Sequence, residues 1–461
     1  MTRLLNLGSR ANGARIISQV TRILVANRGA IARRVVRACN EMGLHSIALY
    51  SDADAQAPHL AEASETVHLP GNRALETYLN QAAILQAAVD TGADSVHPGY
   101  GFLAENADFA EAVQAQGLTF VGPAPRWLRD MGDKIAARSL FADNQFPVFA
   151  GSAQITDAAH AQQLAQEIGF PVMLKPAGGG GGMGMEVVQH PDQLEAAMAR
   201  AQAIAGQAFA DSAIYLERWI ADPRHIEFQI LADGQGGAMH LFERECSVQR
   251  RTQKLIEESP APGLSADKLA LHADLAAQIC GQLGYDNVGT LETLFTGEGD
   301  VGFLEMNTRI QVEHGVTEMV TGVDLVQQQI RLARGEPLPP QGSRQGFAVE
   351  ARLYAEHAHT FMPSTGRLSR LYIPTLEGIR VECGYQQGQQ ITPYYDALIA
   401  KVIASGSTRE MAIGRLLVAL KAIEIEGVDT NAALLRSVLQ DESFLAGQVD
   451  TGIVGRLLGG S

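Results

Sequence analysis

The stretch Phe303–His314 reads FLEMNTRIQVEH, and polar and apolar residues alternate along it. In an extended chain, side chains two residues apart project from the same face. We therefore predict one strand whose functional face carries Glu305, Asn307, Arg309, Gln311 and Glu313. Asn and Glu are poor strand formers, and a face that only meets solvent more often carries Thr or Lys. The pattern favours a functional site over its alternative, a surface strand with several ion pairs.

The residue types on this face are suited to a metal ion and a small anion. Glu305 and Asn307 offer the oxygen ligands that Mg²⁺ prefers, and Glu292, on the strand candidate before it, could be a third ligand. The guanidinium of Arg309 can bind a planar anion such as bicarbonate through two parallel hydrogen bonds. Glu313 lies close enough along the strand to act as a general base. These types together predict one site for a metal and an anion.

A glycine-rich loop lies upstream of this stretch. Lys175 is followed by Pro and Ala and then by residues 178–184, which read GGGGGMG. Glycine is entropically costly to order, so six glycines in seven residues do not serve stability. Such a loop lets backbone N–H groups approach an anion and can move when a ligand binds. With a lysine ending the strand before it, the loop is predicted to bind phosphate; the alternative is a flexible surface linker.

Composition excludes several classes of protein. The chain has 461 residues, which suggests about three domains at roughly 100–200 residues each. Its net charge of −15 repels a phosphate backbone, so we expect no nucleic-acid partner. No run of 18 apolar residues occurs, so we expect no membrane span. The four cysteines are scattered, which is typical of free thiols in a reducing compartment: Cys39, Cys246, Cys280 and Cys383.

The order of predicted elements indicates an α/β protein. Strand candidates at Arg22–Asn27 and Ser46–Ser51, and a third that ends at Ser95–His97, alternate with helical patterns, which is typical of a parallel sheet. A single glycine follows the first run, so the dinucleotide-binding fingerprint is absent. Residues 1–20 contain arginine but no acidic residue. We expect them to be an extension in a cytoplasmic protein, with an organelle-targeting segment as the alternative.

Nine motifs occur in register along the chain and resemble the biotin carboxylase component of biotin-dependent acyl-CoA carboxylases. The similarity covers about residues 22 to 445 and rests on these segments: 27–29 (NRG), 97–106 (HPGYGFLAEN), 131–134 (MGDK), the glycine loop, 223–236 (PRHIEFQILADGQG), 249–254 (QRRTQK), 257–263 (EESPAPG), 305–314 (EMNTRIQVEH) and 393–401 (PYYDALIAK). One motif alone would be weak, but nine in order are specific.

The resemblance implies an α/β protein with the ATP-grasp fold. It would have a Rossmann-like N-terminal domain at 1–130, an ATP-grasp domain at 131–340 with a mobile glycine-loop lid at 149–219, and a C-terminal α+β domain at 341–461. The activity implied is the ATP- and bicarbonate-dependent carboxylation of biotin through carboxyphosphate. The alternatives are another ATP-grasp ligase, such as a carbamoyl-phosphate-forming enzyme, and a non-catalytic nucleotide-binding subunit.

The resemblance also implies a role for each matched residue. ATP would be bound by Lys134, Lys175, Gly180, Gly181, Gly182, His225, Gln249 and Thr252, with its adenine against Glu217, Arg218, Trp219 and Ile220. Mg²⁺ or Mn²⁺ would be held by Glu292, Glu305 and Asn307. Bicarbonate would be bound by Lys254, Arg309, Gln311 and Val312 and deprotonated by Glu313, while Arg352 would stabilise the biotin enolate.

Partners follow from the same resemblance. The chain contains no Ala-Met-Lys-Met biotinylation signal, so biotin is expected on a separate biotin carboxyl carrier protein. A separate carboxyltransferase, which chooses the acyl-CoA acceptor, and a homodimer are expected as well. Three residues depart from the family pattern: Thr252 replaces His or Asn, Met183 replaces Arg, and Gly315 replaces Pro. The first two put ATP affinity and the ordering of the lid in question.

Overall fold

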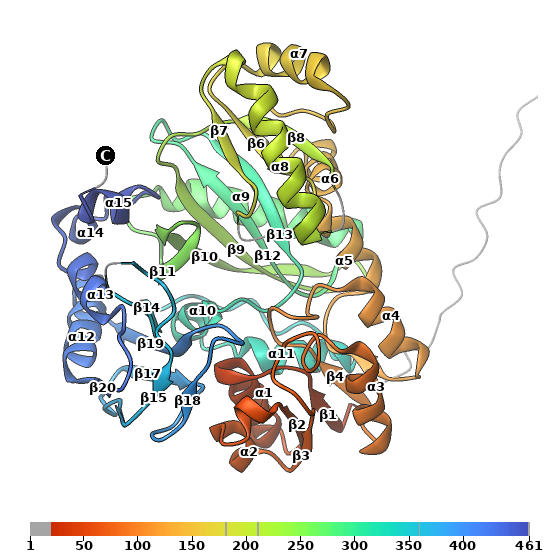
Figure 1. Cartoon of the computed structure of the whole chain (residues 1–461), viewed down its shortest axis with the longest axis vertical. Coiled ribbons are helices and arrows are strands. Elements are labelled where there is room, and N and C mark those ends of the chain that lie inside the picture. Colours follow the sequence, from red (N-terminus) through yellow and green to blue (C-terminus); the bar gives the residue numbers. More distant parts are fainter. Residues whose placement is uncertain (1–19, 180–181, 210–211, 359, 460–461) are drawn as a thin grey trace, which may run out of the picture.

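The computed structural model describes residues 20–179, 182–209, 212–358 and 360–459. The expected N-terminal extension and the glycines at 180 and 181 therefore lie outside the described residues. Within the described part, no helix combines the length and the apolar character that a membrane crossing needs. Figure 1 shows the N-terminal unit at one end of the molecule, a large curved sheet in the middle, and the lid at the other end.

The N-terminal unit is a parallel α/β sheet in the order β3-β2-β1-β4-β5. Its strands are β1 (Arg22–Val25), β2 (His45–Tyr50), β3 (Glu65–His68), β4 (Ser95–His97) and β5 (Thr119–Phe120). Its helices are α1 (Gly29–Glu41), α2 (Pro58–Glu62), α3 (Gln81–Asp90), α4 (Ala107–Ala115) and α5 (Pro125–Gly132). Helix α1 buries Ile31, Val35 and Cys39 at a spacing of four residues, which packs one face of the helix on the sheet. The parallel sheet expected from the sequence is confirmed.

The lid is a small α/β unit built on a three-stranded antiparallel sheet in the order β7-β6-β8. It follows α6 (Lys134–Asp143) and contains α7 (Ala158–Ile168), β6 (Val172–Pro176), β7 (Glu186–Val188), α8 (Leu194–Phe209) and β8 (Ile214–Arg218). The glycine segment connects β6 to β7. Both of these strands therefore fix the ends of a loop that has no regular structure of its own in its described part.

An eight-stranded sheet in the order β13-β12-β9-β10-β11-β14-β19-β17 forms the centre of the molecule. Its strands are β9 (Arg224–Asp233), β10 (Ala238–Arg250), β11 (Gln253–Ser259), β12 (Asp286–Phe295), β13 (Val301–Asn307), β14 (Phe347–Tyr354), β17 (Ile379–Cys383) and β19 (Leu398–Gly406). The antiparallel pairing of β11 with β14 joins the central part of the chain to its C-terminal part in one hydrogen-bonded sheet.

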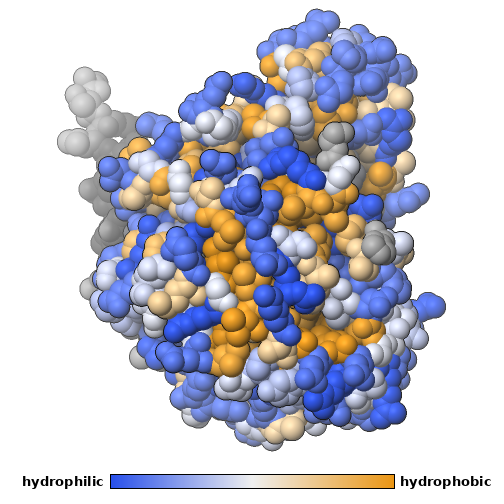
Figure 2. Space-filling model, turned by 90° about the vertical axis from the view of Figure 1, so that its left-hand side faces the viewer, coloured by the Kyte–Doolittle hydropathy of each residue, from blue (hydrophilic) through white to orange (hydrophobic). Residues whose placement is uncertain are grey.

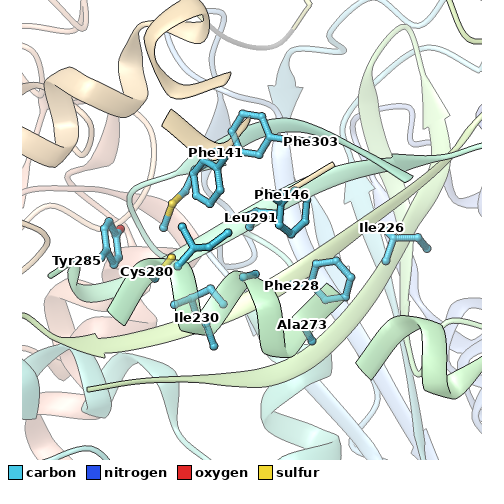
Figure 3. Close-up of a cluster of buried hydrophobic side chains, with 14 of the residues drawn as sticks. Phe141, Phe146, Ile226, Phe228, Ile230, Ala273, Cys280, Tyr285, Leu291 and Phe303 are labelled. Carbon is cyan, nitrogen blue, oxygen red and sulfur yellow. The ribbon is translucent and has the colours of Figure 1, made fainter. Parts of the chain in front are cut away.

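Two large hydrophobic cores pack against this sheet. Helix α9 (Ala266–Leu283) and aromatic residues of α6 and β13 pack beneath β9 and β12, and Figure 3 shows Phe141, Phe146, Phe228, Leu291 and Phe303 converging there. A second core joins β14 and β19 to α12 (Arg409–Ala422), α13 (Ala432–Leu439), α14 (Glu442–Leu445) and α15 (Ile453–Leu457). On the opposite face, Leu231 of β9 and Val288 of β12 pack against the N-terminal unit, and polar residues occupy the part of β9, β12 and β13 that lies nearer the lid.

The remaining elements are short. Helices α10 (His314–Thr321) and α11 (Leu325–Ala333) follow β13, and two ribbons pair β15 (Gly366–Arg367) with β18 (Gln390–Ile391) and β16 (Arg370–Tyr372) with β20 (Glu424–Glu426). The face formed by the C-terminal helices mixes apolar and hydrophilic residues, and Figure 2 shows apolar surface along its centre. Met411 and Val418 of α12 are among the exposed apolar side chains.

Candidate active site

One cavity of about 540 Å³ lies between the lid, the β10–β11 hairpin and the ends of β12 and β13. Every sequence-predicted site residue within the described ranges lines it: Lys134, Lys175, Gly182, Glu217, Arg218, Trp219, Ile220, His225, Gln249, Thr252, Lys254, Glu292, Glu305, Asn307, Arg309, Gln311, Val312, Glu313 and Arg352. Gly180 and Gly181, the other two candidates, lie outside the described residues. Residues that are up to 218 positions apart in the chain therefore share one cavity.

Strand register places the acidic residues of this cavity in one row. Arg244 lies opposite Glu227, Glu227 opposite Glu292, and Glu292 opposite Glu305. Directly opposite residues in an antiparallel sheet project from the same face, with their Cβ atoms about 4.5–5.5 Å apart. Four neighbouring strands thus bring one arginine and three carboxylates together.

The prediction of a single extended strand through residue 313 is wrong. Strand β13 ends at Asn307, residues 308–313 have no ladder partner, and α10 begins at His314. The apolar residues that produced the alternating pattern belong to three different cores: Met306 packs beneath the central sheet, Ile310 against the N-terminal unit, and Val312 against the C-terminal core. An irregular segment that crosses three cores therefore gives the same period of two as a strand.

Lys254 is the centre of the charged cluster. Its Nζ donates to Glu227 Oε2 at 2.6 Å, Glu292 Oε1 at 2.9 Å and Glu313 Oε1 at 2.7 Å. Burial alone would lower the pKa of Lys254, but these three carboxylates hold it well above its usual value. The lysine is therefore charged at any pH near neutrality and joins the acidic row to Glu313.

Arg352 contacts Glu313 from the other side. Its Nη2 donates to Glu313 Oε2 at 2.9 Å, and its Nε pairs with Glu257 Oε1 at 2.5 Å. Burial would raise the pKa of Glu313, but Lys254, Arg352 and Arg244 hold it well below its usual value. Burial raises the pKa of Glu257 to about 7, against the effect of Arg352. Glu313 is thus a carboxylate held between two cations.

The candidate metal ligands meet where β12 and β13 face each other. Glu292 Oε1 accepts hydrogen bonds from Asn307 Nδ2 at 2.9 Å and from Gln311 Nε2 at 2.6 Å, and its Oε2 lies 2.7 Å from His225 Nε2. Glu305 accepts a hydrogen bond from Lys134 at 2.9 Å. Two carboxylates and an amide oxygen on adjacent strands form a donor set that fits Mg²⁺.

Arg309 and Lys134 point toward this same end of the cavity. Arg309 Nη2 donates to Asn307 Oδ1 at 2.8 Å, and its Nε donates to Glu105 of the N-terminal unit at 2.8 Å. Burial would lower the pKa of Arg309, but Glu105 and nearby carboxylates raise it. The guanidinium is therefore held by two acceptors beside the acidic row.

The lid contributes a second charged pair. Lys175 Nζ donates to Glu217 Oε2 at 2.6 Å, and Tyr215 donates to Glu217 Oε1 at 2.8 Å. Burial would raise the pKa of Glu217, but Lys175 and Arg138 lower it. Because Glu217 lies on β8 and Lys175 on β6, this pair fixes the side chain of the lysine at the end of the strand that precedes the glycine loop.

The glycine loop rests on the tip of the β10–β11 hairpin. Gly182 has a φ of +74°, and a Cβ placed on it would lie 2.7 Å from Thr252 Cγ2, so a larger residue would be both strained and in collision. Arg251 and Thr252 at the tip also have positive φ, of 49° and 67°. Such a backbone is costly for a β-branched residue and occurs often at ligand-binding positions. Met183, the second departure, is 54% exposed.

Four residues that support this site were not predicted from the sequence. Glu227 and Arg244 are fully buried behind Lys254, Glu105 holds Arg309, and Glu257 holds Arg352. A signal for Glu227 exists in segment 224–230, where His225, Glu227 and Gln229 alternate with apolar residues as in the stretch around Glu305. Arg244 has no comparable signal, because a shift in register interrupts β10.

Comparisons with known proteins assign this geometry to a family. The family described as biotin carboxylase, N-terminal domain, matches residues 19–128, and the biotin carboxylase C-terminal domain matches 350–456. The family described as carbamoyl-phosphate synthase L chain, ATP binding domain, matches 133–341. A biotin carboxylase of Allochromatium vinosum is 44% identical over 96% of this chain and 99% of its own length. The chain belongs to the biotin carboxylase family.

Two further relatives place the family in larger enzymes. The mitochondrial methylcrotonoyl-CoA carboxylase subunit alpha of Oryza sativa is 43% identical over 95% of this chain but only 60% of its own length. The biotin carboxylase domain dimer of Hydrogenobacter thermophilus 2-oxoglutarate carboxylase, crystallised with MgADP, ADP and bicarbonate, is 41% identical. Its TM-score is 0.92, with 95% of this chain and 97% of that chain covered. Biotin carboxylase thus occurs both as a protein of this length and as part of longer chains.

Proposed function

We propose that the 540 Å³ cavity is where this biotin carboxylase uses ATP and bicarbonate to carboxylate biotin, the first half-reaction of a biotin-dependent carboxylase. The observation that carries the proposal is Lys254. Its ammonium contacts both Glu292, a candidate metal ligand, and Glu313, the candidate base that Arg352 also holds. Groups for phosphoryl transfer and groups for biotin chemistry are therefore joined through one side chain.

The nucleotide would occupy the lid side of the cavity. Lys134, Lys175 and His225 would neutralise its phosphates, and the loop that includes Gly182 would cover them, with the adenine against residues 217–220. Gln249, which donates to His225 at 2.7 Å, and Thr252 would complete this half of the site. A bound Mg²⁺ or Mn²⁺ would neutralise charge on the phosphates, and Glu292, Glu305 and Asn307 would hold it.

Bicarbonate would lie between Lys254 and Arg309, against Gln311 and Val312. Glu313 would take its proton, after which a bicarbonate oxygen attacks the γ-phosphorus and ADP leaves. A base works best when its pKa is near the working pH, and the pKa of Glu313 in the cavity without ligands lies well below that range. Anions bound beside Glu313 oppose the effect of Lys254 and Arg352, so their arrival raises the pKa of the carboxylate and makes it a stronger base.

The second stage would take place beside Arg352. Carboxyphosphate decomposes to CO₂ and phosphate, the phosphate takes the N–H proton of the biotin ureido group, and the resulting enolate attacks CO₂. Arg352 would stabilise the enolate oxygen through its guanidinium, which Glu257 and Glu313 keep in place. Closure of the glycine loop on the hairpin would exclude water during this step.

The test is ATP hydrolysis with bicarbonate and free biotin. We expect ADP release to require bicarbonate and to rise with biotin, with carboxybiotin as the product, and Glu313→Gln to lower both while keeping the fold. The matched control is Glu298→Gln, which changes an exposed acid outside the cavity. Absence of biotin stimulation at every concentration would refute the proposal. Ammonia-dependent turnover without biotin would indicate another ATP-grasp ligase, and tight ATP binding without turnover would indicate a non-catalytic subunit.

Partners and organisation complete the proposal. We infer that the biotin is supplied by a separate carrier protein and that a carboxyltransferase consumes the carboxybiotin; the similarity to a protein named as a subunit of methylcrotonoyl-CoA carboxylase in Oryza sativa supports an assembly of this kind. We also propose a homodimer, supported by the dimer of the Hydrogenobacter domain, and a cytoplasmic location. The division at residues 130 and 340, with the lid at 149–219, stays a prediction. Copurification with tagged carrier and transferase subunits would test the assembly.

A further inference from the structure

The anion-binding segment 308–313 has no strand or helix to hold it. It is fixed instead by side chains from the elements around it. Glu105 accepts from the N–H of Thr308, and Arg244 donates to the side chain of Gln311 at 2.8 Å. Among the described residues of the C-terminal part, one side chain holds the main chain of the segment: the Nζ of Lys401 in β19 donates to the carbonyl oxygen of Val312.

Lys401 is fully buried. Its ammonium lies 2.7 Å from Glu382 Oε2 of β17 and 3.7 Å from Glu350 Oε2 of β14. Three oxygen atoms thus surround a group that has three N–H donors. Because a buried ammonium costs several kcal/mol unless it is well paired, this position is occupied for a specific contact.

The presence of lysine rather than arginine at position 401 also indicates a specific contact. The sequence contains six lysines and thirty arginines, so arginine is the ordinary cation of this chain. Lys134, Lys175 and Lys254 line the cavity, and Lys401 holds its wall. A lysine ammonium is compact, whereas the planar guanidinium of arginine needs more space and has five donors. Among the described residues, the Val312 carbonyl is the main-chain acceptor that this compact charge reaches.

The position of the Val312 carbonyl determines how its neighbours in the segment are oriented. Val312 lines the cavity, and within the described residues its N–H has no acceptor. On one side lies Gln311, which donates to Glu292, and on the other lies Glu313. Fixing this carbonyl sets the orientation of the peptide plane between Val312 and Glu313. It thereby also sets the direction in which Gln311, Val312 and Glu313 face a bound anion.

We propose that Lys401 is a positioning residue for bicarbonate: it holds the Val312 carbonyl and so presents Gln311, Val312 and Glu313 to the anion. The inference rests on the proposed function, because it assumes that bicarbonate binds at this segment. Lys401 itself does not line the cavity, so it acts through the segment and not by touching the substrate.

Replacing Lys401 by an apolar residue would not leave a buried carboxylate without a partner. Glu382 keeps the side chain of Arg380 as an ion-pair partner. Burial raises the pKa of Glu350 to about 8, so this carboxyl can stay neutral near pH 7 without a cation. Lys401→Met is therefore expected to fold, and Lys401→Met combined with Glu382→Gln is the second variant if it does not. Lys421→Met, which changes an exposed lysine of α12, is the matched control.

The experiment measures binding of sodium bicarbonate by calorimetry in the presence of MgADP, and ADP binding alone. We expect Lys401→Met to weaken bicarbonate binding at least tenfold, to change ADP affinity less than twofold, and to raise the bicarbonate KM without raising the ATP KM. Unchanged bicarbonate affinity would overturn the inference. A parallel loss of ADP affinity, or misfolding of both variants, would make Lys401 a residue of general stability and would also overturn it. Absence of bicarbonate binding by the unmodified protein would instead refute the proposed function.

Discussion

Replacement of Lys254 by Met removes the one ammonium that three buried carboxylates share. Breaking a buried ion pair costs about 3–5 kcal/mol, because the partner is left as an uncompensated buried charge. Arg244 still pairs with Glu227, and Arg352 still pairs with Glu313, so we expect the lower end, about 3 kcal/mol. The shift in the midpoint of unfolding is roughly 2–4 °C per kcal/mol for 150–250 residues and becomes smaller for larger units, so for this chain of 461 residues we expect a fall of at most about 6–12 °C.

The loss should depend on pH in a defined direction. Without Lys254, the carboxylates repel one another and the pKa of at least one of them rises above its value in the unfolded chain. A group whose pKa is raised in the folded state stabilises the fold at low pH and loses that contribution as pH rises through the folded pKa. We therefore expect the variant to lose more stability, relative to the unmodified protein, at pH 8 than at pH 5.5.

Urea unfolding at the two pH values, followed by tryptophan fluorescence, measures the difference. Trp127 is buried beside the central core and Trp219 lines the cavity, so the two tryptophans report on both. Lys421→Met serves as the control, with an expected change below about 0.5 kcal/mol for a surface substitution. A deficit below about 1 kcal/mol, or one equal at both pH values, would refute the shared-ammonium account of the cluster.

Three further outcomes are expected. Glu305→Gln should abolish Mg²⁺-dependent turnover at unchanged fold, as measured by ADP release over a metal titration; full activity would remove Glu305 from the metal site. Arg352→Ala should lower biotin carboxylation far more than bicarbonate-dependent ATP cleavage, since Lys254 still holds Glu313, and equal losses in the two assays would contradict its role at the enolate. Burial raises the pKa values of the Cys39 and Cys280 thiols to about 12, so a thiol reagent at pH 8 should leave the native protein unmodified and react with four thiols after denaturation. Rapid reaction of native protein would show that a cysteine is accessible.

Much of the fold was predictable because it depends on local patterns. A strand ends at His97 as expected, and the run from Arg22 ends as a strand at Val25, two residues early, where the chain turns toward α1. The continuity of the central sheet was not predictable. The order of the strands is decided by packing between distant segments. The sequences of β11 and β14 contain no pattern that predicts that these two strands pair.

The same distinction applies to the site. The residues that line the cavity carry chemistry that is recognisable in short motifs, and the described ones do meet there. The shape of segment 308–313 was not predictable, because its apolar residues belong to different cores. The supporting residues were missed for a related reason: Arg244 stands in a strand of ordinary mixed sequence, and Lys401 ends a recognised motif that assigned it no role, so the register was needed to give both a function.

The antiparallel pairing of β11 with β14 limits how this enzyme can be truncated or combined with parts of its relatives. The family boundaries near residues 341 and 350 divide the sequence, yet Ile256 to Ser259 pair with Ala348 to Ala351 across that division. Removing the C-terminal quarter of the chain would leave the amides and carbonyls of this edge of β11 unpaired, and an unpaired strand edge is a template for aggregation. Exchanging that quarter between biotin carboxylases that serve different acyl-CoA acceptors would break the same strand pairing. The spacing between Lys254 and Arg352 depends on the hydrogen bonds that pair β11 with β14, so under the proposed function we expect the bicarbonate site and the biotin site to be inherited together.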